Sequence, residues 1–141
     1  MDARTWLRQM YDLERYIRYL KSEKRRVEEL RCSLPSLAPN DVRSQGNSSG
    51  NARYVDIIAR TEKELDLILA RLASAIEERE LLCVNIRSAA EELKDPLERD
   101  VILYRYCQRL TSEKTAQKMH YSVRHVKRIH ASALTHIKPT K

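Results

Sequence analysis

Apolar side chains recur every three or four residues along most of the chain, which is the period that places them on one face of an α-helix. The longest regular run spans residues 52–93 and follows this alternation without a slip. Its inward positions are Tyr54, Ile58, Thr61, Leu65, Ile68, Leu72, Ala75, Arg79, Leu82, Ile86, Ala89 and Leu93. At a rise of 1.5 Å per residue, this run predicts a single helix roughly 60 Å long.

A second, shorter run covers about residues 3–31 and forms a heptad seam with two polar breaks. The seam consists of Met10, Leu13, Ile17, Leu20, Lys24, Val27, Arg31 and Leu34, and Trp6 and Leu7 extend it toward the N-terminus. A long helix cannot bury its own seam, so each run needs a partner, and the other run is the nearest one. The two runs therefore predict a long antiparallel, coiled-coil-like helical hairpin in residues 1–94.

The two runs are separated by residues 32–51, which show no periodic apolar face. This stretch, CSLPSLAPNDVRSQGNSSGN, contains both glycines of the chain and two of its four prolines. Such a composition is typical of a loop. Its Gly/Ser tract does not have the spacing of a phosphate-binding loop, and no Lys-Ser or Lys-Thr pair follows it.

The second run carries more apolar side chains than one seam can bury. Those outside the seam are Ile57, Leu67, Leu69, Ile76, Leu81 and Val84. The first run is also too short to cover the whole of the second. Exposed apolar surface of this extent favours self-association, most simply as a homodimer. We place the contact with a second chain at five seam residues, Leu65, Ile68, Leu72, Leu82 and Ile86.

Three shorter helices are predicted in residues 95–138, because three helix-start signals follow one another there. A proline at the first position of a helix is well tolerated, since its missing N–H would have no partner within the helix. The start signals are Asp95 followed by Pro96, then Thr111 or Ser112, and last Ser122. The second helix is expected over about residues 113–119, and the third over about residues 123–137 after a turn at residues 120–121. The fold class is therefore all-α.

The last of these helices has one apolar and one basic face. The apolar stripe is Val126, Ile129, Ala133, Leu134 and Ile137, and the outer side of the first two turns carries Val123, Arg124, His125, Lys127 and Arg128. A short helix, a tight turn and a second helix with basic residues near its start is the arrangement in which a helix-turn-helix enters the major groove of DNA.

The distribution of charge supports this interpretation. Residues 98–141 hold ten Lys and Arg against three acidic residues, which equals the whole net charge of +7 of the chain. Such a segment is suited to a polyanion, because each neutralised phosphate releases counterions. The basic run at residues 21–26, KSEKRR, is followed by two glutamates, so we interpret it as solvated helix surface.

The segment ERDVILYRYCQRLTSEKTAQKMHYSVRHVKRIHASAL resembles the region-four DNA-binding module of bacterial sigma factors. It is more similar still to sigma-region-four-like phage regulators of the RinA and ArpU type, which control late or structural genes. The features that carry the resemblance are the run LYRY, the opening YSVRHV of the last helix, and the run RIHASAL after it. The resemblance implies a sequence-specific transcriptional regulator that binds double-stranded DNA and activates late genes. It would act either by binding upstream of a promoter or by replacing the host sigma module at RNA polymerase.

By position, the resemblance assigns phosphate contacts to Thr111, Lys118 and Ser122, and base or backbone contacts to the last helix. The candidate DNA-binding residues are Thr111, Lys118, Ser122, Val123, Arg124, His125, Lys127 and Arg128. Two positions depart from the family pattern. Thr115 stands where a larger aliphatic residue is usual, and His120 stands where Gly or Asp usually turns the chain. Both would loosen the motif, and neither removes its basic face.

Composition and cysteine usage narrow the class of protein further. The uncharged stretches are too short to span a bilayer and no signal peptide precedes Trp6, so we expect no membrane contact and a cytoplasmic location in a bacterial host. Cys32, Cys83 and Cys107 are far apart and odd in number, so we expect them to be reduced.

Enzymatic chemistry finds little support in the sequence. His120, His125, His130 and His136 lie five, five and six residues apart, which places them on different helical faces. No cysteine or carboxylate stands beside them at the spacing of a metal site, and no serine has a credible His/Asp pair. We therefore expect no metal, no cofactor and no catalysis.

The sequence is also compatible with two other functions. Small terminase subunits, which act in DNA packaging, also join a helix-turn-helix to helical oligomerisation arms, and a ring of many copies would favour that function. The other function is that of a helical interaction or scaffold protein whose basic end binds an acidic protein. Such a protein would not bind duplex DNA.

Overall fold

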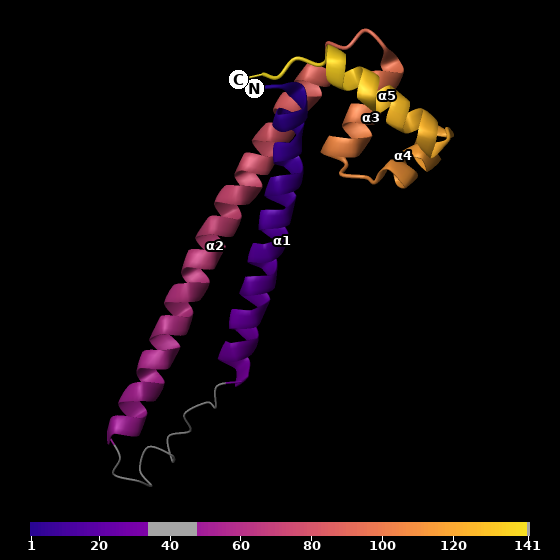
Figure 1. Ribbon diagram of the computed structural model, residues 1–141. Coiled ribbons are helices and arrows are strands. Elements are labelled where there is room, and N and C mark those ends of the chain that lie inside the picture. Colours follow the sequence, from indigo (N-terminus) through magenta and orange to yellow (C-terminus); the bar gives the residue numbers. More distant parts are fainter. Residues whose placement is uncertain (34–47, 141) are drawn as a thin grey trace. The chain divides into compact units, whose positions relative to one another are not determined.

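The computed structural model describes residues 1–33 and 48–140, and nearly all of them are helical. The elements are α1 (Ala3–Ser33), α2 (Ser48–Glu91), α3 (Pro96–Ile102), the π-helical turn η1 (Leu103–Cys107), α4 (Ser112–Met119) and α5 (Val123–His136) (Figure 1). No strand occurs among the described residues. The all-α prediction, with a long helical arm before a helix-turn-helix, is confirmed.

Both long helices extend into the range predicted as a loop, residues 32–51. Cys32 and Ser33 are the last residues of α1, and residues 48–51 form the first turn of α2. Ser and Asn are common at helix starts, because their side chains accept hydrogen bonds from the free N–H groups there. The same residue types that indicate a loop are thus also frequent at the position just before a helix. Residues 34–47, including Leu34 of the predicted seam, lie outside the described residues.

The chain divides into two compact units, and the division falls inside both long helices. One unit consists of residues 16–75, and the other joins residues 1–15 to residues 76–141. The domain boundary predicted between residues 94 and 95 stays a prediction.

In the unit of residues 16–75, α1 and α2 run antiparallel. Val27 of α1 packs against Leu65 and Ile68 of α2, and all three side chains are buried. Ion pairs flank this contact, with 3.2 Å between Arg26 and Glu64 and 3.2 Å between Arg31 and Glu62. Ion pairs between exposed side chains contribute little to stability. The buried apolar contact therefore holds this part of the predicted hairpin together.

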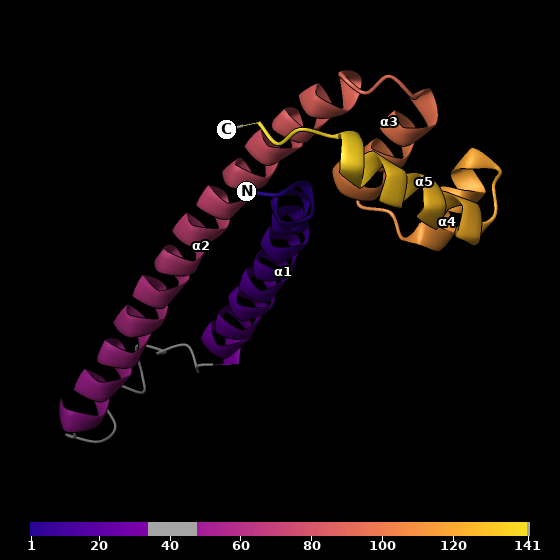
Figure 2. The same ribbon diagram turned by 45° about the horizontal axis from the view of Figure 1, so that its top comes forward.

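In the other unit, the first turns of α1 complete a core shared with four other elements. Leu7 and Met10 are fully buried against α2, α3, η1 and α5. The buried members of this core are Trp6, Leu7, Met10, Leu82, Cys83, Ile86, Ala89, Ala90, Ile102, Tyr106, Ala133 and Ile137. Both views show the start of α1 beside the end of α2 (Figures 1 and 2). The N-terminal segment is therefore part of the structure that supports the C-terminal helices.

A smaller core holds α3, α4 and α5 together. It consists of Val101 from α3, Ala116 from α4, and Val126 and Ile129 from α5. The inward stripe predicted for the last helix is confirmed at four positions, and its fifth residue, Leu134, is half-buried. Because α5 contributes to both cores, its rotation about its own axis is fixed along its length.

The five residues predicted to face a second chain are all buried within the single chain. Leu65 and Ile68 pack against α1 in one unit, and Leu82 and Ile86 belong to the core of the other. Association through them stays a prediction. The large apolar side chains that α2 leaves exposed are Val55, Ile57, Leu67, Leu69, Leu81 and Val84.

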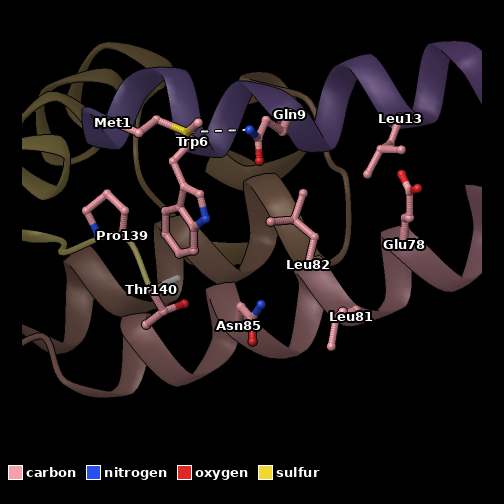
Figure 3. A pocket seen from close by; sticks show the side chains of 10 residues that line it. All are labelled: Met1, Trp6, Gln9, Leu13, Glu78, Leu81, Leu82, Asn85, Pro139 and Thr140. Carbon is pink, nitrogen blue, oxygen red and sulfur yellow. Dashed lines mark hydrogen bonds between the residues drawn. The ribbon is translucent and has the colours of Figure 1, made fainter.

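A pocket of about 530 Å³ lies between the start of α1 and the end of α2. Figure 3 shows the indole of Trp6 extending from α1 toward α2, with Leu82 beside it. Of the ten residues that line the pocket, Glu78 is the one with a charged side chain. An apolar lining with a single carboxylate is unsuited to a polyanion.

Two predictions from composition can be compared with the structure directly. Among the described residues, no helix is both long enough and apolar enough to cross a membrane. The three cysteines are free thiols. Cys107 is half-buried and donates a hydrogen bond from Sγ to the carbonyl oxygen of Cys83 at 3.6 Å. Burial raises the pKa of the Cys107 thiol to about 12, so it stays protonated at neutral pH.

The shared core predicts that a truncation in α1 weakens the whole unit. Met10→Ala removes a fully buried side chain and should lower the free energy of unfolding by about 2–5 kcal/mol in chemical denaturation. Leu67→Ala, at a residue 58% exposed, serves as the control and should change it by less than about 0.5 kcal/mol. Equal effects of the two substitutions would contradict the core described here.

Candidate nucleic-acid interface

The start of α4 is fixed by a side-chain cap. Thr111 has extended backbone angles, and its Oγ1 accepts a hydrogen bond from the N–H of Lys114 at 3.2 Å. Of the two predicted caps, Thr111 is therefore the correct one. Buried Thr115 donates its own hydroxyl to the carbonyl oxygen of Thr111 at 2.8 Å. This bond explains how a hydroxyl is accommodated where a larger aliphatic side chain is usual, since a buried donor needs a partner.

The turn between α4 and α5 is made at His120. This residue adopts the left-handed conformation, with φ 59° and ψ 38°, and its N–H donates to the carbonyl oxygen of Ala116. The N–H of Tyr121 donates to the same oxygen at 3.1 Å. The left-handed region costs a residue with a Cβ about 1–2 kcal/mol, which is why Gly is frequent there. The turn predicted at residues 120–121 is confirmed, and His120 takes the conformation that Gly usually supplies.

The start of α5 turns its basic side chains outward. Ser122 caps the helix by accepting a hydrogen bond from the N–H of His125 at 3.1 Å. Val126 and Ile129 are buried on the inner face of the helix, whereas Arg124, Lys127 and Arg128 are exposed. The amphipathic spacing of the sequence therefore places all three cations on the solvent side.

Four of the eight predicted DNA-binding residues meet in one shallow hollow. Its volume is about 410 Å³, and no acidic side chain is among the six residues that line it. Those residues are His120, Tyr121, Ser122, Arg124, His125 and Arg128. Of the other four predicted residues, Thr111, Lys118 and Lys127 are exposed and Val123 is half-buried, and none of them lines the hollow.

Tyr121 is a site residue that the sequence interpretation missed. It is 41% exposed, and its ring meets the ring of His125 edge-on with 4.8 Å between centroids. Its position at the turn, directly before the cap of α5, is the signal that could have identified it. An exposed aromatic ring among cations is suited to contacts with sugar or base.

At its other end, α5 is fixed by a buried carboxylate. Glu98 of α3 is only 4% exposed and accepts a hydrogen bond from the hydroxyl of Ser132 at 2.6 Å. Nδ1 of His136 lies 3.0 Å from both carboxylate oxygens. Glu98 stands three residues before Val101 and four before Ile102, so its spacing places it on the buried face of α3. This acidic residue is therefore turned away from the basic surface.

His130 also faces the interior, where it fixes α5 against η1. Its Nε2 lies 2.7 Å from the hydroxyl of Tyr106, and the two rings are stacked with 5.7 Å between centroids. Burial, with smaller contributions from the charges of Arg105 and Arg4, lowers the pKa of His130 from 6.5 to about 4. Burial likewise raises the pKa of Tyr106 above its ordinary value. Both groups are therefore neutral at neutral pH.

The four histidines occupy four different environments. His120 forms the turn, His125 lies against Tyr121, His130 against Tyr106, and His136 against Glu98. Within residues 1–33 and 48–140, no group of three or more His, Cys, Asp and Glu side chains could hold a metal ion.

The geometry of α4, the left-handed turn and the exposed cations of α5 define a helix-turn-helix of the DNA-binding class. In comparisons with known proteins, residues 95–138 match the family described as Sigma-70, region 4, which covers 44 of the 141 residues. This segment is a sigma-70 region 4 domain, a helix-turn-helix of the DNA-binding class. No curated protein and no solved structure matches the chain.

The lowered pKa of His130 predicts a pH-dependent stability. In the unfolded chain this histidine takes up a proton near pH 6.5, but in the folded chain it resists protonation until about pH 4. The free energy of unfolding should therefore fall as the pH is lowered from 6.5 toward 4, because the proton favours the unfolded state. In chemical denaturation between pH 7 and 5, His130→Gln should reduce this slope. An identical slope in the variant would contradict the burial of a neutral imidazole.

Proposed function

We propose that the chain is a sequence-specific transcriptional regulator that binds duplex DNA and activates late genes of a phage or prophage. The observation that carries the proposal is the orientation of α5. Arg124, Lys127 and Arg128 face solvent at the start of the helix, while Val126 and Ile129 bury the opposite face. The role is one of binding, with no catalysis and no cofactor, in the cytoplasm of a bacterial host.

The start of α5 enters the major groove of the duplex. Arg124 and Arg128 present planar guanidinium groups, which pair with the O6 and N7 acceptors of guanine. Phosphate contacts from the exposed residues Thr111 and Lys118 of α4 and from Ser122 set the register of the helix on the duplex. Sequence is thus read by α5, while most of the salt-dependent affinity comes from the phosphates.

The finer assignment to phage late genes is supported by the sequence around α5. The runs YSVRHV and RIHASAL are similar to those of phage regulators of the RinA and ArpU type. Two modes of activation are compatible with a region-four-like domain. The chain binds upstream of a promoter, or it replaces the corresponding domain of the host sigma factor at RNA polymerase.

The assembly we propose is a homodimer. Leu81 and Val84 of α2 are 63% and 58% exposed, and their spacing of three residues places both on one helix face, where an apolar patch favours contact with a second chain. A dimer also presents two recognition helices, which suits two half-sites on one duplex. A ring of many copies would instead favour a DNA-packaging protein, and binding to an acidic protein without any duplex would favour a scaffold.

The double substitution Lys127→Ala with Arg128→Ala tests the DNA-binding face. The wild-type chain first selects duplexes from a randomised library, and binding to the selected duplex is followed by fluorescence anisotropy. The variant should lose specific binding, at about 1–3 kcal/mol for the base contact of Arg128, and its salt slope should fall by about one for a phosphate contact of Lys127. Its melting temperature should stay unchanged, because both side chains are exposed.

The matched control for this pair is Lys21→Ala with Arg25→Ala, which removes the same charge from exposed positions of α1. It should bind the selected duplex nearly as tightly as the wild type. If the two double variants lose the same affinity, the contribution is net charge alone, and α5 is not the recognition helix.

Leu81→Glu tests the dimer. A charge in the middle of an apolar contact is strongly destabilising, so the variant should sediment as a monomer at concentrations where the wild type sediments as a dimer. The Lys127→Ala, Arg128→Ala variant serves as the control and should remain dimeric. An unchanged sedimentation mass for Leu81→Glu would show that this face of α2 does not carry the association.

A further inference from the structure

The segment that leads into α4 contains a backbone conformation that its residue type does not favour. Arg109 has a φ of 57°, in the left-handed region where Gly is usual. Arg109 lies two residues after the end of η1. Two hydrogen bonds close that end: the N–H of Gln108 donates to the carbonyl oxygen of Leu103, and the N–H of Leu110 donates to that of Tyr104, both at 3.0 Å. A glycine would form this turn without strain, so the arginine side chain calls for an explanation.

That side chain makes an ion pair with α1. Nε of Arg109 lies 3.1 Å from Oε1 of Glu14, and Nη1 of Arg79 in α2 donates to the same oxygen at 2.9 Å. The Glu14 and Arg79 side chains are only 20% and 15% exposed, and that of Arg109 is 36% exposed. One largely buried carboxylate thus joins α1 and α2 to the residue that lies two positions before Thr111, the cap of α4.

A second contact from α1 lies one helical turn away from Glu14. The hydroxyl of Tyr11 donates to the carbonyl oxygen of Arg105 at 3.4 Å, and its ring lies 5.2 Å from that of Tyr106. The guanidinium of Arg105 lies over the Tyr11 ring at 5.9 Å. Tyr11 therefore contacts η1, and Glu14 contacts the turn that follows η1.

From this arrangement we infer that Glu14 is a positioning residue for DNA binding, although it lies on a different element from the recognition helix. This inference rests on the proposed function. Glu14 holds Arg109 in the left-handed conformation, which fixes the turn from which α4 starts. Thr111 and Lys118, the proposed phosphate contacts of α4, depend on that start. When the carboxylate is lost, the turn relaxes and α4 no longer holds its place beside α5.

The sign of the effect separates positioning from simple electrostatics. Removing the charge of Glu14 makes a DNA-binding protein more positive, so long-range attraction alone would tighten its binding to DNA. Loss of a positioned turn weakens binding instead, because small displacements of contact groups reduce affinity. Asp12 offers a matched control, since it lies on α1 two residues away and is exposed, with a loose contact of 3.9 Å to Arg15.

The experiment compares Glu14→Gln with Asp12→Asn in the full chain, on the duplex that the wild type selects from a randomised library. Glu14→Gln should weaken specific binding by about three- to tenfold, whereas Asp12→Asn should leave it unchanged or slightly tighter. The salt slope should be lower for Glu14→Gln than for Asp12→Asn, because a displaced α4 loses the proposed phosphate contact of Lys118. Stoichiometric titration should show the same active fraction for both variants, which excludes a folding defect as the cause.

Arg109→Gly closes a double-mutant cycle. Glycine takes the left-handed conformation freely and has no guanidinium for Glu14 to hold, so Glu14→Gln should change affinity by less than about twofold in this background. The inference is overturned if Glu14→Gln binds as tightly as Asp12→Asn, or if its loss persists undiminished beside Arg109→Gly. A wild type that selects no duplex would overturn the proposed function, and this inference with it.

Discussion

The burial of one side of α5 is the constraint on which the rest of the structure depends. Val126 and Ile129 pack into the small core with α3 and α4, and Ala133 and Ile137 pack into the larger core. A helix buried at four positions along one stripe cannot rotate without exposing apolar surface, at about 25 cal/mol per Å². The cations at positions 124, 127 and 128 face solvent as a consequence.

The supporting core is assembled from both ends of the chain. Trp6, Leu7 and Met10 enter it from the start of α1, and Ile86 enters it from α2. The polar contacts follow the same plan, since Tyr11 and Glu14 reach η1 and the turn after it. The region 4 domain at residues 95–138 is thus completed by residues outside the segment that matches the family. The start of α1 and the end of α2 therefore belong to the core that supports α5.

The sequence predicts most of what is local in this structure. The caps Asp95, Thr111 and Ser122 act within three residues of themselves, and all three are present. The helical periodicity likewise identifies the buried and exposed faces of α5. Glu98, by contrast, has its hydrogen-bond partners Ser132 and His136 more than thirty residues later in the chain. Such partners are invisible to an argument from spacing alone.

The left-handed conformation of Arg109 could not be predicted for the same reason. It is compatible with an arginine because Glu14, far away in the sequence, accepts its guanidinium. The hydrogen bond between Tyr106 and His130 and the π-helical form of η1 also depend on packing among several elements. The prediction of a loop at residues 48–51 was wrong for a different reason. Ser and Asn are frequent both in loops and just before helices, so composition does not fix where a helix begins.

The most direct test of the central claim is a chemical-shift map of the isotope-labelled chain titrated with its selected duplex. The account predicts that the largest changes fall on residues 120–128, with small changes on the buried stripe of α5. If the largest changes instead fall on the basic run at residues 21–26 of α1, the recognition surface has been placed on the wrong helix.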